Sequence, residues 1–203
     1  MKKLLFALLV LAAQQAWAQH GSTETLFGSG KPGKIGGYGM ATTKFTSIDD
    51  NLGVIVGAHG GVFLNKRWML GAAGYSLVNN ISLPVVNTGA YKEYLNFWYT
   101  GLVVEYTHNS DKLVHWNVGT LLGGGGVGRR NKWHDDFDDN DISDGSGFFI
   151  AEPFANLELN ITKFLRLDVG ASYRHIQGSS TVGISDSKLS GPSLQVGIKA
   201  GKF

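Results

Sequence analysis

The stretch that decides the fold is Ala151–Arg174, which reads AEPFANLELNITKFLRLDVGASYR. Apolar and polar residues alternate with a period of two on both sides of Thr162 and Lys163. This period is typical of β-strands, and the break in it indicates a tight turn. Pairing Ile161 with Leu165 keeps the apolar residues of both halves on one face, so the stretch predicts an antiparallel hairpin.

The other face of this hairpin is polar and charged. The same register places Glu158 opposite Asp168, and two facing carboxylates are unfavourable unless a cation lies between them. We therefore expect Arg166 or Lys199 to lie between the two carboxylates.

The same alternation recurs along most of the chain and predicts eight strands, at about 34–47, 52–64, 68–79, 93–107, 112–128, 148–161, 164–176 and 190–203. Short turns (65–67, 108–111, 162–163) alternate with long connections (80–92, 129–147, 177–189), and only 48–51 is short on the second side. Barrels of bacterial outer membranes have short turns in the periplasm and long loops outside the cell. The sequence therefore predicts an all-β fold, an eight-stranded antiparallel up-and-down transmembrane β-barrel with periplasmic termini and extracellular long loops.

The start of the chain has the pattern of an export signal. Lys2 and Lys3 precede an apolar run, Leu4–Ala13, and Ala16-Trp17-Ala18 fits the cleavage pattern of secretory signal peptides. The chain has no cysteine and no run of more than two Lys or Arg, so we expect neither disulfides nor a nucleic-acid partner. We predict a signal peptide (1–18), a periplasmic N-terminal segment (19–33) and an outer-membrane β-barrel (34–203).

Alternation alone does not say which face of the strands points outward. A soluble lipocalin-like barrel has its apolar face inside, whereas a membrane barrel has it outside. The polar face here is rich in glycine and its charges nearly cancel, which suits a narrow interior better than a surface in water. We therefore predict an ion network in the lumen, with Glu152 paired to Arg174, that contains Glu105, Glu152, Glu158, Arg166, Asp168, Arg174 and Lys199.

Aromatic residues of the apolar face lie near the strand ends, as in the interfacial girdles of membrane barrels. This distribution also favours an outward apolar face. The predicted interfacial aromatics are Trp68, Tyr106 and Trp116 toward the short turns, and Trp98, Phe149 and Tyr173 toward the long connections.

These features resemble the small outer-membrane barrels typified by the OmpA membrane domain and OmpX. The motifs EPFANLELN and GASYR within 152–174, and the ending SGPSL…GKF at 190–203, resemble barrel proteins common in Bacteroidota. The resemblance implies a porin-like fold in the cell envelope of a Gram-negative bacterium and assigns no chemistry. One departure is that the positions in step with the terminal Phe203 are Gly201 and Lys199 rather than apolar residues.

His175, followed by Ser179 and Ser180, is similar to the motif of lipid A deacylases, which are eight-stranded barrel hydrolases. Such a site needs a hydroxyl, an imidazole and a carboxylate within hydrogen-bond reach. The spacing differs here, and His175 falls on the predicted lipid face near the rim. We predict a rim histidine without catalytic function, with an acyl hydrolase as the alternative.

The segment 134–145 is rich in aspartate, and oxygen-rich loops can bind Ca²⁺. It fails the EF-hand pattern, because glycine falls at the seventh position from Asp139 and not at the sixth. A solvated outer loop is the alternative interpretation. The candidate Ca²⁺ ligands are Asp135, Asp136, Asp138, Asp139, Asp141 and Asp144.

Three smaller features have structural interpretations. Gly123–Gly126 lacks the Lys-Ser/Thr of a phosphate-binding loop and predicts a strand that packs closely on its neighbours. Arg129 and Arg130 are expected at the rim, where they either meet lipid phosphates or anchor the strand. His59 and His115 are predicted to be separate polar residues of the lumen rather than a metal pair.

An eight-stranded barrel has an interior just wide enough to be filled by side chains, so we predict no open channel. The expected function is structural or involves contacts of the outer loops, without enzymatic activity, cofactor or metal. The expected partners are outer-membrane lipid, lipopolysaccharide and the barrel assembly machinery, and the expected state is a monomer. A lipid A-modifying acyl hydrolase and a soluble lipocalin-like periplasmic binder remain the alternatives.

Overall fold

The computed structural model describes residues 35–83, 93–131, 142–181 and 183–203. Among these residues, no helix is long and apolar enough to span a membrane. The elements in this part of the chain are β1 (Ile35–Ile48), β2 (Asn51–Leu64), β3 (Trp68–Leu77), β4 (Ser82–Leu83), β5 (Glu93–His108), β6 (Val114–Asn131), β7 (Ile142–Asn160), β8 (Leu165–Gln177), α2 (Asp186–Leu189) and β9 (Gly191–Lys202).

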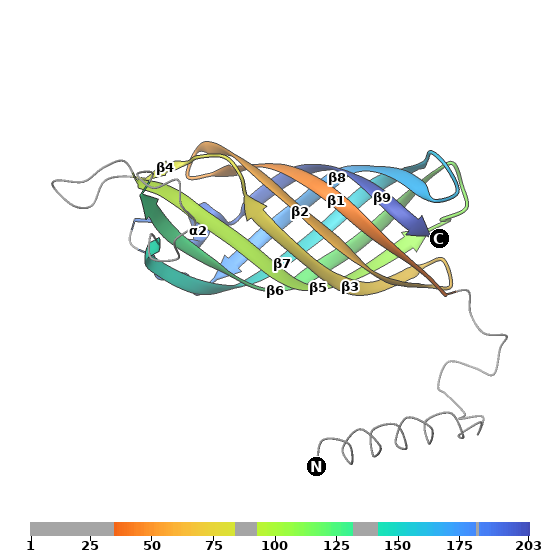
Figure 1. Ribbon diagram of the computed structural model, residues 1–203, viewed down its shortest axis with the longest axis horizontal. Helices are drawn as coiled ribbons and strands as arrows, with labels where there is room; N and C mark the ends of the chain where they lie inside the picture. Colours follow the sequence, from red (N-terminus) through yellow and green to blue (C-terminus); the bar gives the residue numbers. More distant parts are fainter. Residues whose placement is uncertain (1–34, 84–92, 132–141, 182) are drawn as a thin grey trace, which may run out of the picture. The chain divides into compact units, whose positions relative to one another are not determined.

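The long strands form one closed antiparallel sheet. Their order is β3-β2-β1-β9-β8-β7-β6-β5, and the pairing of β3 with β5 closes it, while the two-residue β4 extends the wall beside β5. Figure 1 shows the tight turns at one end of the barrel, here called the turn end, and β4 and α2 at the other, here called the loop end. The predicted eight-stranded up-and-down barrel is confirmed.

The predicted hairpin of β7 and β8 is also confirmed. Leu157 lies opposite Val169, and Glu158 lies opposite Asp168. The backbone N–H of Ile161 donates a hydrogen bond of 3.0 Å to the carbonyl of Leu165, which closes the turn. The alternation of Ala151–Arg174 was therefore sufficient to predict the register.

β3 ends at Leu77, two residues earlier than predicted, because the side chain of Asn79 takes the place of the backbone. Its Oδ1 accepts a hydrogen bond from the N–H of Val54, and its Nδ2 donates to the carbonyl of Leu52, both at 2.7 Å. An amide side chain that satisfies both backbone groups of the neighbouring strand removes the need for a regular ladder there.

β6 and β7 are longer than predicted and extend the wall at the loop end. Their register shifts between Val127 and Arg129, which indicates a bulge or irregularity. Gly123–Gly126 lies within β6, and a Cβ atom at Gly123 would collide with the carbonyl oxygen of Thr100. The predicted close packing at these glycines is confirmed.

The two hairpin turns at opposite ends of β2 contain left-handed residues. Asp49 and Asp50 have φ of 49° and 60°, and Asn65 and Lys66 have φ of 53° and 58°. Asp and Asn tolerate this region better than most residues, and it matches the right-handed twist of paired strands. These turn residues therefore fix the register of β2 with both neighbours.

Exposure alternates along the strands and shows which face points outward. Leu157, Val169 and Val196 are 63%, 51% and 40% exposed, whereas Glu152 and Arg174 are 1% and 0% exposed. The apolar face is therefore on the outside of the barrel and the charged face is inside.

Candidate functional site: the barrel interior and its rims

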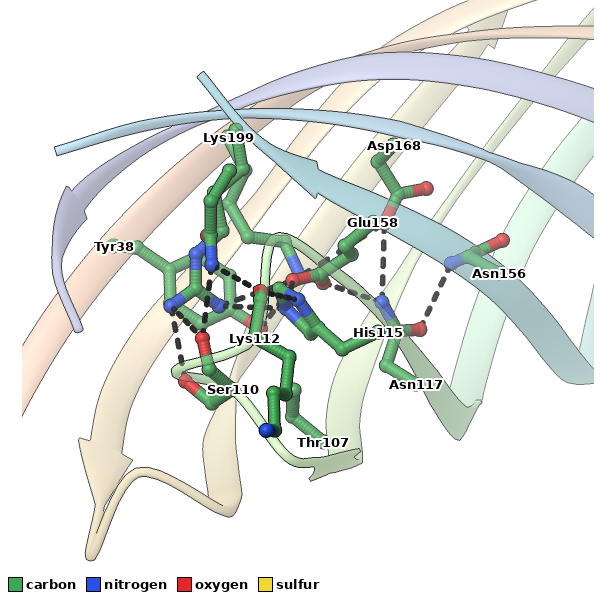
Figure 2. A network of polar contacts seen from close by, with 12 residues as sticks. Tyr38, Thr107, Ser110, Lys112, His115, Asn117, Asn156, Glu158, Asp168 and Lys199 are labelled. Atoms are coloured by element: carbon green, nitrogen blue, oxygen red, sulfur yellow. Dashed lines mark hydrogen bonds and ion pairs between the residues drawn. The ribbon is translucent and has the colours of Figure 1, made fainter. Parts of the chain in front are cut away.

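Lys199 lies at the centre of a group of buried charges near the turn end, shown in Figure 2. Its ammonium is 2.9 Å from Glu105 and 4.0 Å from Asp168, and it also contacts Glu158. All four side chains are at most 1% exposed. The cation therefore lies among three carboxylates, which include the facing pair that the sequence predicted to need one.

Glu158 has two further cationic or donor neighbours. Nη1 of Arg166 donates to it at 3.0 Å, and Nε2 of His115 lies 2.7 Å from it. Nη2 of Arg166 donates to the hydroxyl of Ser110 at 2.9 Å, and the guanidinium carbon lies 3.6 Å from the ring centroid of Phe203. Arg166 thus joins the buried carboxylate to the turn after β5 and to the terminal aromatic ring.

Neutral amides continue this network toward the middle of the barrel. Asn117 donates to Glu158, and to Asp168 at 3.1 Å (Figure 2). Asn156 donates to the Oδ1 of Asn117 at 3.0 Å, and Gln195 donates to the Oδ1 of Asn156 at 2.6 Å. We call this whole set the turn-end cluster; its members are Tyr38, Glu105, Ser110, His115, Asn117, Asn156, Glu158, Arg166, Asp168, Gln195 and Lys199.

A second ion pair lies midway along the barrel. Nζ of Lys44 donates to Oε2 of Glu152 at 2.8 Å, and the hydroxyls of Tyr99 and Ser172 donate to the same carboxylate at 2.9 and 2.7 Å. The same ammonium lies 3.7 Å from the ring centroid of Tyr75. The ammonium and two hydroxyls thus satisfy the carboxylate directly.

The predicted ion pair between Glu152 and Arg174 is wrong. Nε of Arg174 instead donates to the carbonyl of Leu189 at 2.7 Å, and its guanidinium carbon lies 5.3 Å from the ring centroid of Phe97. Glu152 pairs with Lys44, which reaches it across the lumen from β1. Strand register predicts which residues are adjacent in the wall, but not which side chains meet across a narrow interior.

The structure buries all seven residues of the predicted ion network inside the barrel. Six of them make direct polar contacts with one another or with Lys44, and Arg174 is set apart near the loop end. With Lys44 included, this buried set has four cations and four carboxylates. The cations are Lys44, Arg166, Arg174 and Lys199, and the carboxylates are Glu105, Glu152, Glu158 and Asp168. The formal charges of these eight described residues therefore cancel.

The interior is largely apolar near the loop end, where the sequence predicted a polar network, although Arg174 and the Glu93–Arg129 pair are buried there as well. Phe97 stacks on Phe148 with ring centroids 5.4 Å apart, and Leu189 of α2 is fully buried against this group. We call this set the loop-end core; its main members are Ile48, Ile55, Leu95, Phe97, Val127, Phe148, Ile150, Ile176, Ile184 and Leu189. Ile184 and Leu189 therefore add apolar side chains from the connection between β8 and β9 to the loop end of the interior.

A small cavity lies between the two halves, beside Lys44, His59 and Tyr75. Its volume is about 10 Å³, which is roughly the room that one water requires. The Nδ1 of His59 lies 3.0 Å from the hydroxyl of Tyr75, whereas His115 contacts Glu158. The two histidines therefore serve different parts of the interior.

The six predicted interfacial aromatics lie on the outer face. Trp68, Tyr106 and Trp116 form a continuous row at the turn end, with ring centroids 5.0 and 6.0 Å apart. Trp98, Phe149 and Tyr173 lie farther toward the loop end and are 47%, 53% and 51% exposed. The two groups of aromatic residues therefore lie at two different heights along the barrel axis.

The rim beside α2 brings His175, Ser187 and Asp186 around one hollow, as the hydrolase alternative would require. However, Ser179 donates its hydroxyl to Asp186, which also accepts the N–H groups of Gly178 and Ser179 at 2.8 and 2.9 Å. The bond from the Ser179 hydroxyl, with those from the backbone, holds the pKa of Asp186 below its ordinary value of 3.8. Among the described residues, the imidazole of His175 makes no hydrogen bond, and the bonds to Asp186 hold the connection in place.

The two rim arginines differ in position. Arg129 is 4% exposed, and its Nε donates to Glu93 at 2.7 Å, so it faces the interior and cannot meet lipid phosphates. Arg130 is exposed, and its Nη2 donates to Asn80 at 3.4 Å. Only Arg130 of the two is placed to contact a lipid headgroup.

Other predicted sites lie outside the described residues. These are the signal peptide and periplasmic segment at 1–33, and the candidate Ca²⁺ ligands Asp135, Asp136, Asp138, Asp139 and Asp141. The side chain of Asp144 is outside them as well. All of these remain predictions.

The fold described above, a closed antiparallel barrel, is similar to that of solved structures. Neisserial surface protein A is similar with a TM-score of 0.59 and 14% identity, over 85% of this chain and 100% of that one. The N-terminal β-barrel domain of Pseudomonas aeruginosa OprF is similar with a TM-score of 0.54 and 11% identity, over 83% and 98%. This chain has the fold of the small eight-stranded outer-membrane β-barrels. No family model and no curated protein matches it in sequence.

Several interior residues of this outer-membrane barrel fold were missed from the sequence. Tyr38 donates to Glu105 at 2.6 Å, and Lys44 and Tyr99 hold Glu152. The sequence does contain a signal for Lys44, because the polar residues Thr42, Lys44 and Thr46 occupy alternate positions of β1. All three side chains are buried. Phe148 and Ile150 of the loop-end core carry no such signal, since Phe149 between them makes the outer face of that segment apolar as well.

Proposed function

We propose that this protein is an outer-membrane protein whose eight long strands cross the bilayer, with the turn end in the periplasm and the loop end outside the cell. The observation that carries the proposal is the reversed polarity of a closed barrel, with large apolar side chains outside and ions inside. Exposed apolar patches of this extent mark an interaction surface, and a closed barrel is one of two structures that lipid tolerates. The short turns at one end support the orientation.

The proposed lumen is non-conducting. Four buried cations and four buried carboxylates occupy the interior, apolar side chains of the loop-end core fill its other half, and the cavity between them is about 10 Å³. A chain of waters that conducts ions needs more room than this. We therefore expect the protein to act through its surface and not as a pore.

The proposed role is structural or interactive and non-enzymatic, with a monomeric barrel in contact with outer-membrane lipid and lipopolysaccharide. Arg130, exposed at the loop end, supports contact with lipid phosphates on that side. We also propose that the barrel assembly machinery inserts the protein into the membrane. Neisserial surface protein A is by its name a surface protein, which supports a role of the outer connections.

The test is a gel of boiled and unboiled protein from the membrane fraction, followed by conductance in a planar bilayer. We expect the protein in the outer-membrane fraction, with faster migration before boiling because an intact barrel is compact. We expect no stepwise conductance from the inserted protein. Recovery in the soluble periplasmic fraction would support the lipocalin-like alternative, and a changed acyl pattern of lipid A would support the hydrolase.

A further inference from the structure

The exposed charged side chains of the barrel differ in sign between its two ends. The turn end has one exposed side-chain carboxylate among the described residues, Asp111, which is paired with Lys66. In the described part of the chain, the cationic side chains that are exposed or partly exposed at this rim come from four places: Lys66 and Arg67 before β3, Lys112 before β6, Lys163 before β8 and Lys202 at the end of β9.

The loop end has the opposite balance in the described part of the chain. Asp49, Asp50 and Asp186 lie at its rim together with Arg130 and Lys188. Lys188 is already paired with Asp49 at 2.7 Å. A basic ring is therefore a property of one end of the barrel and does not follow from the overall composition, which is close to neutral.

The position of the basic ring relative to the aromatic row indicates what it contacts. Trp68 and Trp116 are 50% and 41% exposed on the outer face, and rings of this kind lie at the level of lipid headgroups. Arg67 directly precedes Trp68, and Lys112 lies in the turn four residues before Trp116. The cations therefore lie at or just beyond the headgroup level, outside the apolar band.

We propose that the basic ring (Lys66, Arg67, Lys112, Lys163 and Lys202) binds the phosphate headgroups of anionic phospholipids in the leaflet at the turn end. This inference rests on the proposed function, because it requires the barrel to lie in a bilayer. The cations are spread around the rim and do not converge on one pocket, which fits a shell of lipids and not a single soluble anion. One cation near an anionic surface enriches anionic lipid by about fivefold.

The test uses tryptophan fluorescence quenched by lipids with brominated acyl chains. A turn-end reporter carries Trp17→Phe, Trp98→Phe and Trp133→Phe, which leaves Trp68 and Trp116. It is placed in vesicles of equal parts phosphatidylglycerol and phosphatidylcholine at low salt, with one of the two lipids brominated at a time. A complementary loop-end reporter keeps Trp98 alone.

We expect quenching of the turn-end reporter to correspond to about a fivefold excess of phosphatidylglycerol next to the aromatic row, and quenching of the loop-end reporter to show no excess. The excess should disappear at 1 M salt, where the screening length is roughly 3 Å. It should also disappear in a variant with Arg67→Gln, Lys112→Gln, Lys163→Gln and Lys202→Gln. A matched loop-end control with Arg130→Gln and Lys188→Gln should retain it.

The outcomes separate this inference from the proposed function. Equal quenching by both brominated lipids overturns the basic ring as a lipid site, and so does an excess that salt does not change. Absence of quenching by either lipid means that the barrel is not in the bilayer, which overturns the proposed function instead. A gel of boiled and unboiled protein shows whether the four-glutamine variant folds. If it does not fold, the salt dependence of quenching in the turn-end reporter tests the inference instead.

Discussion

The turn-end cluster and the loop-end core lie in the same barrel and are formed by the same strands, yet ions predominate in one and apolar side chains in the other. Lys199 lies among three carboxylates at one end, whereas Phe97 stacks on Phe148 at the other. The cavity between the two regions has a volume of about 10 Å³. One barrel wall with an apolar outer face thus encloses an ionic region and an apolar region side by side.

The two fillings should respond differently to substitution. An ion network depends on the identity of each partner, because removal of one charge leaves others buried and unpaired. An apolar core depends on volume, because a shortened side chain leaves a cavity whose cost varies with its size. The following four changes test this difference, from the largest expected effect to the smallest.

Lys199→Met removes the cation that lies among Glu105, Glu158 and Asp168 while conserving much of the volume. We expect a loss of about 3–5 kcal/mol in the free energy of unfolding, because three buried carboxylates then lack their shared partner. Urea unfolding of the folded protein in lipid vesicles, followed by tryptophan fluorescence, measures it. The control Lys188→Met removes a partly exposed lysine and should cost within about 1 kcal/mol. Similar costs for both variants would show that the turn-end cluster is not a network of interdependent charges.

Leu189→Ala shortens the fully buried residue of α2 that closes the loop-end core. We expect a loss of about 2–3 kcal/mol in the free energy of unfolding by the same measurement, since the cavity sits at the edge of the core where some collapse is possible. Leu189→Met conserves volume and should cost less than about 1.5 kcal/mol. A methionine variant as unstable as the alanine variant would contradict an apolar core that depends on volume.

Tyr99→Phe acts at the boundary between the two regions. Its ring lies 5.6 Å from that of Phe97, while its hydroxyl donates to Glu152. The change removes the hydrogen bond to Glu152 and the one that this hydroxyl accepts from Lys44 at 3.3 Å, so we expect a cost of about 1–2 kcal/mol in unfolding free energy. If Tyr99→Phe lowers the free energy of unfolding by more than Leu189→Ala does, Tyr99 belongs to the ion network and does not lie at the boundary between the two regions.

Asp186→Asn tests the rim, where the effect should be smallest. The depressed pKa of Asp186 means that its contribution is present above the ordinary value of 3.8 and is lost as the pH falls through the lowered value. We expect faster amide exchange at Gly178 and Ser179 in the variant at neutral pH, and no difference from the parent once the carboxyl is protonated. If amide exchange at neutral pH is equally fast in the variant and the parent, Asp186 does not hold the connection between β8 and β9 in place.

The sequence predicted the barrel well because strict alternation carries strand, register and face together. The alternation placed Glu152, Glu158 and Asp168 on one face; the glycines and balanced charges of that face, with the aromatic residues on the other, assigned it to the interior, and all three are buried. The pattern fails where both faces have the same polarity. Phe148 and Ile150 are interior and Phe149 is exterior, so three consecutive apolar residues gave no indication of a core inside the loop end.

Contacts across the lumen are the second limit of sequence reasoning. Lys44 and Glu152 are separated by 108 residues and by several strands of the wall, and only closure of the barrel brings them together. Phe203 is a related case. It is in step with Lys199, as the sequence indicated, and its ring packs on Arg166 inside the turn end.

The central claim is that the apolar face of the strands lies in lipid and the charged face lies inside. The chain has no cysteine, so Ala155→Cys, Leu157→Cys and Leu159→Cys each introduce a unique site for a spin label. Collision rates with lipid-soluble oxygen and with a water-soluble nickel complex are then measured in reconstituted vesicles. The account predicts that oxygen dominates at all three sites; dominance of the nickel complex at these positions would contradict it.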